Sequence, residues 1–217
     1  HHLAQNGMQT VLWAREPEIL AEIGSNRQNS SAFPNFKLNH KIVVEADLAI
    51  AVAAASAVVF AVPSSAMREM AQACRAHLKP SSLLISVAKG LEEQTQLRMS
   101  EVLASESLPI SQISVLSGPS FAKEVLHAKP TAVTVAANSL EVAEQVASYF
   151  HHGYFRIYTS MDVTGVELSG VFKNILAIAA GVVDGLSIGA GARAALITRG
   201  LAEMKRLILS LGGNAET

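Results

Sequence analysis

Apolar and polar positions divide the first two thirds of the chain into short apolar runs that alternate with longer helical patterns. The runs are rich in β-branched residues, which favour strands. Predicted strands cover residues 9–13, 57–62, 83–88, 113–116, 132–136 and 156–158, and predicted helices cover 16–23, 47–55, 65–77, 94–105, 121–126 and 140–150. Continuous apolar strands separated by helices indicate a parallel sheet covered on both faces, the doubly wound α/β architecture.

The pattern changes after about residue 159. Residues 163–186 form one long helical pattern, and residues 192–211 form a second that ends at Gly212-Gly213. No further strand pattern follows. We therefore predict a doubly wound domain over residues 1–159 and the beginning of an all-helical domain over residues 160–217, with the chain ending before that domain could close.

Residues 48–62 and residues 1–7 each have a pattern that allows more than one interpretation. Residues 48–62 carry no charge, but a membrane-spanning helix needs roughly 20 apolar residues. We read them as a helix after Asp47, a turn near Ser56 and a buried strand that Pro63 stops, so no membrane partner is expected. His1-His2 could be the remnant of a tag, but we interpret residues 1–7 as the last turns of a native helix closed by Asn6-Gly7, and we therefore expect further sequence before His1.

Composition narrows the class of protein. Half of the residues are hydrophobic and 16% are charged, which favours a sizeable core over disorder. A net charge of −1 gives no electrostatic case for nucleic acid. The single cysteine, Cys74, excludes an internal disulfide, fits a cytoplasmic location and is expected to be a small buried hydrophobe. No metal site is expected.

Several candidate residues follow predicted strands, where a doubly wound sheet binds its ligand. Arg15 follows the first strand, where an arginine accommodates the 2′-phosphate of a dinucleotide, although a solvated surface arginine fits equally. Ser64 and Ser65 are expected to cap the next helix. Lys89, beside Gly90, suits an anionic group at the crevice.

A turn and a helix complete the candidate set. Gly118 and Pro119 predict a tight turn after which Ser120 caps a helix beginning at Phe121, whose free N–H groups suit an anion. Lys173 and Asn174 interrupt the apolar residues 166–181. Burial would lower the pKa of Lys173 and suit it to proton transfer, whereas a lysine that reaches the surface is the alternative.

Six stretches in this order resemble the bacterial-type NAD(P)-dependent glycerol-3-phosphate dehydrogenases. They are NGMQTVLWAR, VVFAVPS, VAKGLE, LSGPSFAKE, GVELSGVFKNILAIAAGVVDGL and ARAALITRGLAEM, and they extend from Asn6 to Met204. The last two are the most specific. The resemblance implies a Rossmann-type nucleotide domain followed by a helical substrate domain.

The resemblance also implies a reaction, the reversible transfer of a hydride between NADP or NAD and carbon 2, which interconverts sn-glycerol 3-phosphate and dihydroxyacetone phosphate. In the family this reaction supplies glycerol 3-phosphate for phospholipid synthesis. It makes Lys173 the proton acceptor in oxidation and the donor in reduction. It places Lys89 between cofactor and substrate, and Gly118 and Ser120 at the substrate.

By the same resemblance, Ala122 and Arg15 bind the cofactor, and Asn174 orients the substrate or Lys173. Because of Arg15, NADP is expected to be preferred over NAD as the cofactor. A homodimer is expected from the family alone.

Two family segments are not in this sequence: the glycine-rich pyrophosphate loop, expected before His1, and a later GLGD…SRN segment, expected after Thr217. We therefore expect activity from a full-length protein and little turnover from these 217 residues. Two alternatives stay open: a related dehydrogenase acting on a 3-hydroxyacid or 6-phosphogluconate, and a non-catalytic nucleotide-binding remnant.

Overall fold

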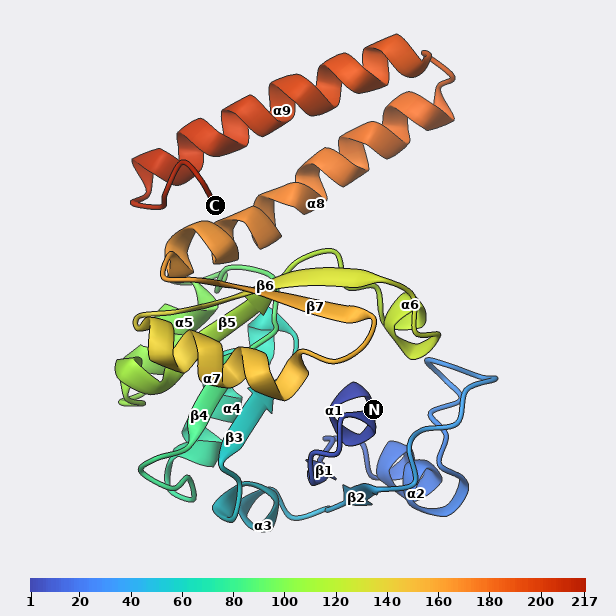
Figure 1. Cartoon of the computed structure of the whole chain (residues 1–217), viewed down its shortest axis with the longest axis vertical. Coiled ribbons are helices and arrows are strands. Elements are labelled where there is room, and N and C mark those ends of the chain that lie inside the picture. The colour runs from blue at the N-terminus through green and yellow to red at the C-terminus, as the bar shows by residue number, and fades with distance from the viewer.

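The computed structural model describes residues 1–217 and has one large sheet, one small sheet and a long helical hairpin (Figure 1). Five strands form the large sheet in the order in which they follow along the chain. They are β3 (Ala57–Phe60), β4 (Leu83–Ser86), β5 (Ile113–Ser117), β6 (Thr131–Ala137) and β7 (Phe155–Ser160). Every predicted strand of this sheet is confirmed, with ends that agree within two residues.

The sheet is mixed, which corrects the prediction of a wholly parallel one. Strands β3, β4 and β5 are parallel, but β6 runs antiparallel to β5, and β7 is parallel to β6. The connection from β5 to β6 contains only the short helix α6 (Ala122–Leu126), which lies beside the sheet end instead of crossing a face (Figure 1). Because the chain makes no crossover there, it returns in the opposite direction.

The small sheet pairs β1 (Thr10–Leu12) in parallel with β2 (Ile42–Val44). Strand β2 was not predicted, because three apolar residues beside Lys41 give too short a run to recognise. Helix α1 (His2–Gln5) precedes β1, and Gly7 at φ 82° closes it, as predicted. Helix α2 (Pro17–Asn26) connects the two strands.

Helices cover both faces of the large sheet, as predicted. They are α3 (Leu48–Ala53), the 3₁₀ helix η1 (Ser64–Ala66), α4 (Met67–Arg75), α5 (Met99–Ser105), the 3₁₀ helix η2 (Ile110–Gln112) and α7 (Leu140–Phe150). Helix α5 begins five residues later than predicted. Residues before it form a turn instead, in which Gln96 has a positive φ and the Glu92 N–H donates to the Leu97 carbonyl.

Two apolar clusters lie on opposite faces of the large sheet. Leu84 packs with α4 and α5 on one face, and its neighbours Leu83 and Ile85 pack with α7 on the other. Burial on both faces explains why β4 reads as a continuous apolar run. Cys74 lies in the first cluster, and burial raises the pKa of its thiol to about 11, which confirms it as a buried hydrophobe.

The C-terminal part is a hairpin of α8 (Val163–Gly185) and α9 (Ala190–Ser210), close to the two predicted helices. All buried residues of α8 lie at or before Gly170, where the helix packs on β5 and β6. Beyond that point α8 runs away from the sheet beside α9 (Figure 1). By length and composition alone, α8 is the one helix apolar enough to cross a membrane, a property that core helices share.

Candidate active site

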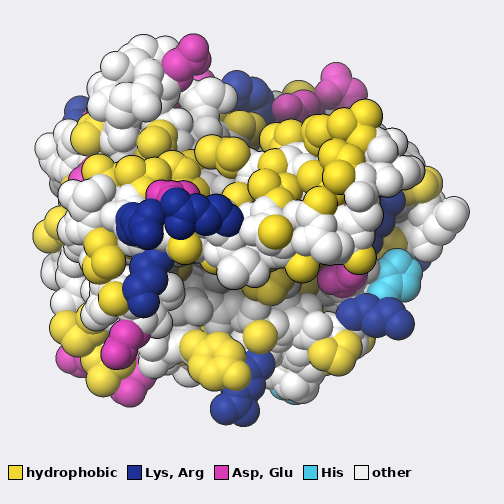
Figure 2. Space-filling view, turned by 90° about the horizontal axis from the view of Figure 1, so that it is seen from above, with side chains coloured by type: hydrophobic (Ala, Val, Ile, Leu, Met, Phe, Trp, Pro, Cys, Tyr) yellow, Lys and Arg dark blue, Asp and Glu magenta, His cyan; other side chains and the backbone are white.

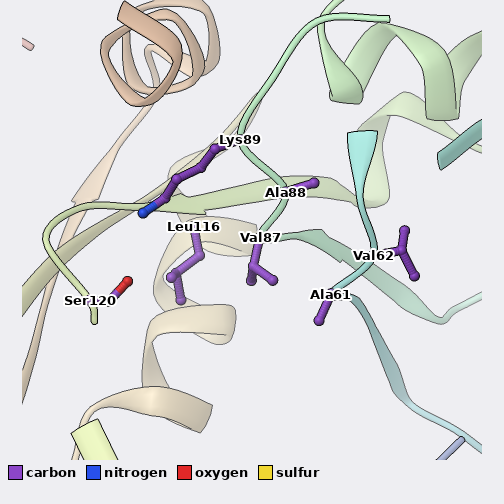
Figure 3. Close-up of a pocket in the computed structure, with 7 residues that line it drawn as sticks. All are labelled: Ala61, Val62, Val87, Ala88, Lys89, Leu116 and Ser120. Carbon is purple, nitrogen blue, oxygen red and sulfur yellow. The ribbon is translucent and has the colours of Figure 1, made fainter. Parts of the chain in front are cut away.

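A cavity of about 400 Å³ lies at the carboxyl ends of β3, β4 and β5 (Figure 3). Its walls are mostly apolar, with Lys89 and Ser120 as the polar members. The lining residues are Ala61, Val62, Val87, Ala88, Lys89, Leu116 and Ser120. Because apolar walls with few polar groups at this edge of a doubly wound sheet are typical of nucleotide sites, this is the candidate active site.

Two lysines from different parts of the chain meet at one backbone carbonyl. The Lys89 ammonium donates to the Gly118 oxygen at 3.0 Å, and the Lys173 ammonium donates to the same oxygen at 3.4 Å. Lys89 follows β4, whereas Lys173 lies on α8, one turn beyond the last buried residue of that helix. Figure 3 shows Lys89 extending toward the segment that carries Ser120.

Neither lysine forms a salt bridge, so two positive charges stand close together without a carboxylate. Burial, and then the nearby charge of Lys173, lower the pKa of Lys89 to about 8. A half-buried pair of cations whose only protein acceptor is a carbonyl is suited to an anionic ligand.

Two glycines permit this close approach. A side chain at Gly118 would meet the backbone of Val133 on β6 at 2.8 Å, and Gly118 has a φ of +149°, which L side chains rarely adopt. A side chain at Gly170 would meet the Ser117 hydroxyl at 2.6 Å and lie 3.8 Å from the Lys89 stem. Gly170 therefore lets α8 lie against the end of β5 and bring Lys173 to the site.

The predicted serine caps are wrong, for a local reason in each case. Ser64 belongs to η1, and α4 begins without a side-chain cap. The Ser64 hydroxyl lies against Gly90, which brings the segment after β3 next to Lys89. Helix α6 begins at Ala122, also without a side-chain cap, because the Ser120 hydroxyl faces the Gly118 carbonyl at 3.5 Å.

Three further predicted site residues, Arg15, Ala122 and Asn174, neither line the cavity nor bind the Gly118 carbonyl. Arg15 is exposed and pairs with Glu69 of α4 at 3.0 Å. Ala122 is exposed at the first position of α6, and Asn174 is exposed on α8 beside Lys173. The structure thus brings together Lys89, Lys173, Gly118 and Ser120, whereas the roles predicted for Arg15, Ala122 and Asn174 remain predictions.

The sequence reading missed two buried carboxylates beside the site. Glu92 binds Arg68 through two hydrogen bonds of 2.8 and 2.7 Å, and Glu167 binds Arg98 at 2.8 Å. A signal was available for Glu167, because a glutamate is unexpected between the apolar residues Val166 and Leu168 at the start of an apolar helical pattern.

A doubly wound sheet with an apolar cavity at its strand ends, faced by a lysine from a following helix, defines a dinucleotide-binding protein of the two-domain dehydrogenase class. The family model for the N-terminus of NAD-dependent glycerol-3-phosphate dehydrogenase matches residues 1–143, and the model for its C-terminus matches residues 162–217. The chain belongs to the NAD-dependent glycerol-3-phosphate dehydrogenase family.

Curated relatives agree with this assignment. A glycerol-3-phosphate dehydrogenase [NAD(P)+] from Carboxydothermus hydrogenoformans is 45% identical over 217 residues, and one from Citrifermentans bemidjiense is 46% identical over 218. Each alignment covers 99% of this chain but only 64% and 65% of the relative. The chain therefore spans about two thirds of the length of the relatives that it matches.

Solved structures of the same family share the fold. The crystal structure of glycerol-3-phosphate dehydrogenase from Coxiella burnetii superposes with a TM-score of 0.90 at 36% identity, covering 99% of this chain and 66% of that one. The yeast enzyme from Saccharomyces cerevisiae superposes with a TM-score of 0.80 at 26% identity, covering 95% of this chain and 63% of that one.

Proposed function

We propose that this chain supplies the NAD(P)-binding domain and the first part of the substrate domain of an sn-glycerol-3-phosphate dehydrogenase that provides glycerol 3-phosphate for phospholipid synthesis. The observation that supports it most is the meeting of Lys89 and Lys173 at the Gly118 carbonyl, beside the cavity. Two unpaired cations suit a phosphorylated substrate whose oxygen gains charge during the reaction.

A bound NAD(P) would supply the hydride chemistry at carbon 2, by which glycerol 3-phosphate and dihydroxyacetone phosphate are interconverted. Lys173 takes the proton of the C2 hydroxyl during oxidation and gives it back to the ketone oxygen during reduction. Lys89, whose pKa lies near 8, keeps a positive charge beside that oxygen at neutral pH. Gly118 and Ser120 border the substrate, and Asn174 orients the substrate or Lys173.

The cavity supports the cofactor assignment. The apolar walls from β3 and β4 would fit a flat ring, and we assign Lys89, which lines the same cavity, to the position between cofactor and substrate. We assign Arg15 to the adenosine end, where its guanidinium would bind a 2′-phosphate, and Ala122 to the cofactor side of α6. Both NADP and NAD are accepted in this proposal, with NADP preferred because of Arg15.

We further propose a domain boundary between residues 159 and 160. Strand β7 ends at Ser160 and α8 begins at Val163, so the proposed boundary precedes the last residue of the final strand, three residues before the hairpin. A cytoplasmic location and a homodimer complete the proposal. A small-molecule substrate follows from the family.

The test is Lys173→Ala in a chain extended to full family length with the remaining segments of the Carboxydothermus relative. Dihydroxyacetone-phosphate-dependent oxidation of NADPH should fall by about three orders of magnitude, since general acid–base catalysis contributes roughly 10²–10⁴-fold and the lysine charge adds to it. Affinity for NADPH, measured by its fluorescence, should change less than about threefold, or roughly 0.7 kcal/mol.

The matched control is Lys205→Ala, which removes an exposed lysine from α9. It should leave the turnover unchanged. A near-normal rate for Lys173→Ala would remove Lys173 from the chemistry. Faster reduction of a 3-hydroxyacid precursor than of dihydroxyacetone phosphate would favour the related dehydrogenase class, and no turnover with any ketone would favour the non-catalytic alternative.

A further inference from the structure

Helix α5 is tied at its first turn to the base of α8. The carboxylate of Glu167 accepts hydrogen bonds from the Ser100 N–H at 2.9 Å, from the Ser100 hydroxyl and from the Arg98 guanidinium at 2.8 Å. Arg98 also binds Glu101 at 2.7 Å, which holds its guanidinium over the start of α5. Glu167 is 9% exposed, and all of these partners lie on the one helix end.

The same helix is tied at its last turn to the segment that follows Lys89. Arg68 donates two hydrogen bonds to Glu92, and it also binds Glu106 and the Ser105 hydroxyl at the end of α5. Glu92 is 7% exposed. A guanidinium that binds a carboxylate through two parallel hydrogen bonds fixes its orientation as well as its distance.

Each of the two carboxylates belongs to a segment that carries a site lysine. Glu92 follows Lys89 by three residues, and Glu167 precedes Lys173 by six residues, roughly 9 Å along the helix axis. The two lysines are held at the site by little else, because each ammonium has one acceptor, the Gly118 carbonyl. Their separation therefore depends on how the two segments are anchored.

We propose that Glu167 is a positioning residue for Lys173, and that α5, bound to Glu167 at one end and to Glu92 at the other, sets the separation of the two lysines. The importance of this lysine separation for catalysis rests on the proposed function. The role of Glu167 in placing Lys173 does not rest on it. Glu167 touches neither lysine, so it acts through the placement of α8.

The free energy of the buried Glu167 carboxylate favours a role in positioning α8 over a role in stabilising the fold. Burial raises the pKa of Glu167, although its hydrogen bonds with Ser100 and the charge of Arg98 act in the opposite direction. A carboxylate held where burial disfavours its charge adds little net stability, yet it defines one arrangement of its partners. An apolar residue at this position would pack against α5 without fixing where along it α8 docks.

The test uses the 217-residue chain grown with lysine labelled with ¹³C at the ε carbon. Eight lysines give a spectrum that single substitutions can assign. In Glu167→Gln, the amide nitrogen cannot accept the bond from Arg98, so the attachment of α8 to α5 is weakened while the Ser100 N–H bond is retained. Lys173 then moves from Lys89, and the pKa of Lys89 should rise from about 8 by roughly one pH unit, toward its ordinary 10.5.

The matched control is Glu203→Gln, which removes an exposed carboxylate of the same charge from α9. It should leave the Lys89 titration unchanged. If Glu167→Gln does not fold, Ser100→Ala, which removes one bond to Glu167 and retains Arg98, should give a smaller rise in the same direction. An unchanged Lys89 titration in a folded variant of either kind would overturn the proposal.

Because the measurement needs no substrate or cofactor, its outcome is separate from that of the proposed function. A rise in the Lys89 pKa with no activity in the extended chain would retain the positioning role and reject the dehydrogenase. Activity that depends on Lys173, with no effect of Glu167 on Lys89, would do the reverse.

Discussion

The central strands of the large sheet and helix α8 are both largely apolar in sequence but have opposite surroundings. Every residue of β4 and β5 is buried, whereas α8 has no buried residue beyond Gly170. Ile85 on β4 is 0% exposed and Ile178 on α8 is 71% exposed. An apolar pattern therefore specifies which element forms, but not whether another part of the protein packs against that element.

Figure 2 looks onto the molecule from the hairpin side and shows hydrophobic side chains gathered across the surface, with Lys and Arg among them. The exposed apolar side chains on α8, on α9 and in the turn between them are Ile175, Ile178, Val182, Leu186, Ile188, Ile197, Leu201, Leu207, Leu209 and Leu211. An apolar surface of this extent is unusual for a monomer. The two regions should therefore respond very differently to the same substitution.

The largest expected effect comes from an identical change in both regions. Ile85→Ala should lower the free energy of unfolding by about 2–5 kcal/mol, because it opens a cavity between two packed faces. Ile178→Ala should change it by less than about 0.5 kcal/mol, because its side chain is already in water. Urea unfolding followed by circular dichroism measures both values.

The two variants control for each other, since the atoms removed are the same. An Ile178→Ala cost close to that of Ile85→Ala would show that the hairpin is covered in solution, for example by a second copy. In that case the cost should also depend on protein concentration.

A smaller effect is expected at the junction of the two regions. Lys89 has a folded-state pKa near 8 and an ordinary pKa of 10.5, so its charge opposes folding at neutral pH. Between these two values the unfolded chain binds more protons, and stability rises with pH. Lys89→Met should therefore be more stable than the natural chain at pH 7, by about 1 kcal/mol after allowing for partial exposure.

This advantage should shrink as the pH rises through 8 toward 10.5. Urea unfolding at pH 7, 9 and 10 would follow it. A difference that stays constant over this range would place the Lys89 pKa outside it, and a less stable variant at pH 7 would show that the bond to Gly118 outweighs the buried charge.

The smallest effect is expected at the exposed pair of Arg15 and Glu69. Glu69→Gln should change the free energy of unfolding by less than about 1 kcal/mol, as is typical for exposed pairs. If Arg15 binds a 2′-phosphate, its release from Glu69 should raise the affinity for NADPH over NADH by up to about fivefold in the extended chain.

Fluorescence titration with each nucleotide would measure that ratio. Glu18→Gln on α2 is the control for the loss of one exposed negative charge. An equal change for NADPH and NADH would separate Arg15 from the 2′-phosphate.

The sequence predicted most of the fold because most elements have a strong local pattern. Strand β4 is a continuous apolar run, and α8 and α9 have long helical periods, so each was located within a few residues. Two errors concern features with no local pattern. The direction of β6 depends on where α6 lies, and β2 is three residues long.

Only those parts of the site that have a local sequence signal were predicted. Lys89, Gly118 and Lys173 stand out within their own segments, and the structure brings them together. The contact between Glu167 and Arg98 joins residues 69 positions apart, and nothing near either residue indicates the other. The capping predictions failed because a serine before a helix has other acceptors within reach, as Ser120 does at Gly118.

The attachment of α8 only at its base has a mechanical consequence. Lys173 lies three residues beyond Gly170, about 4.5 Å along the axis, whereas Gly185 lies about 22 Å beyond it. If the hairpin pivoted by about 5° at Gly170, Lys173 would move by about 0.4 Å and the far end by about 2 Å. Lys173 is therefore close to the pivot point, and a movement of the outer hairpin would change its position very little.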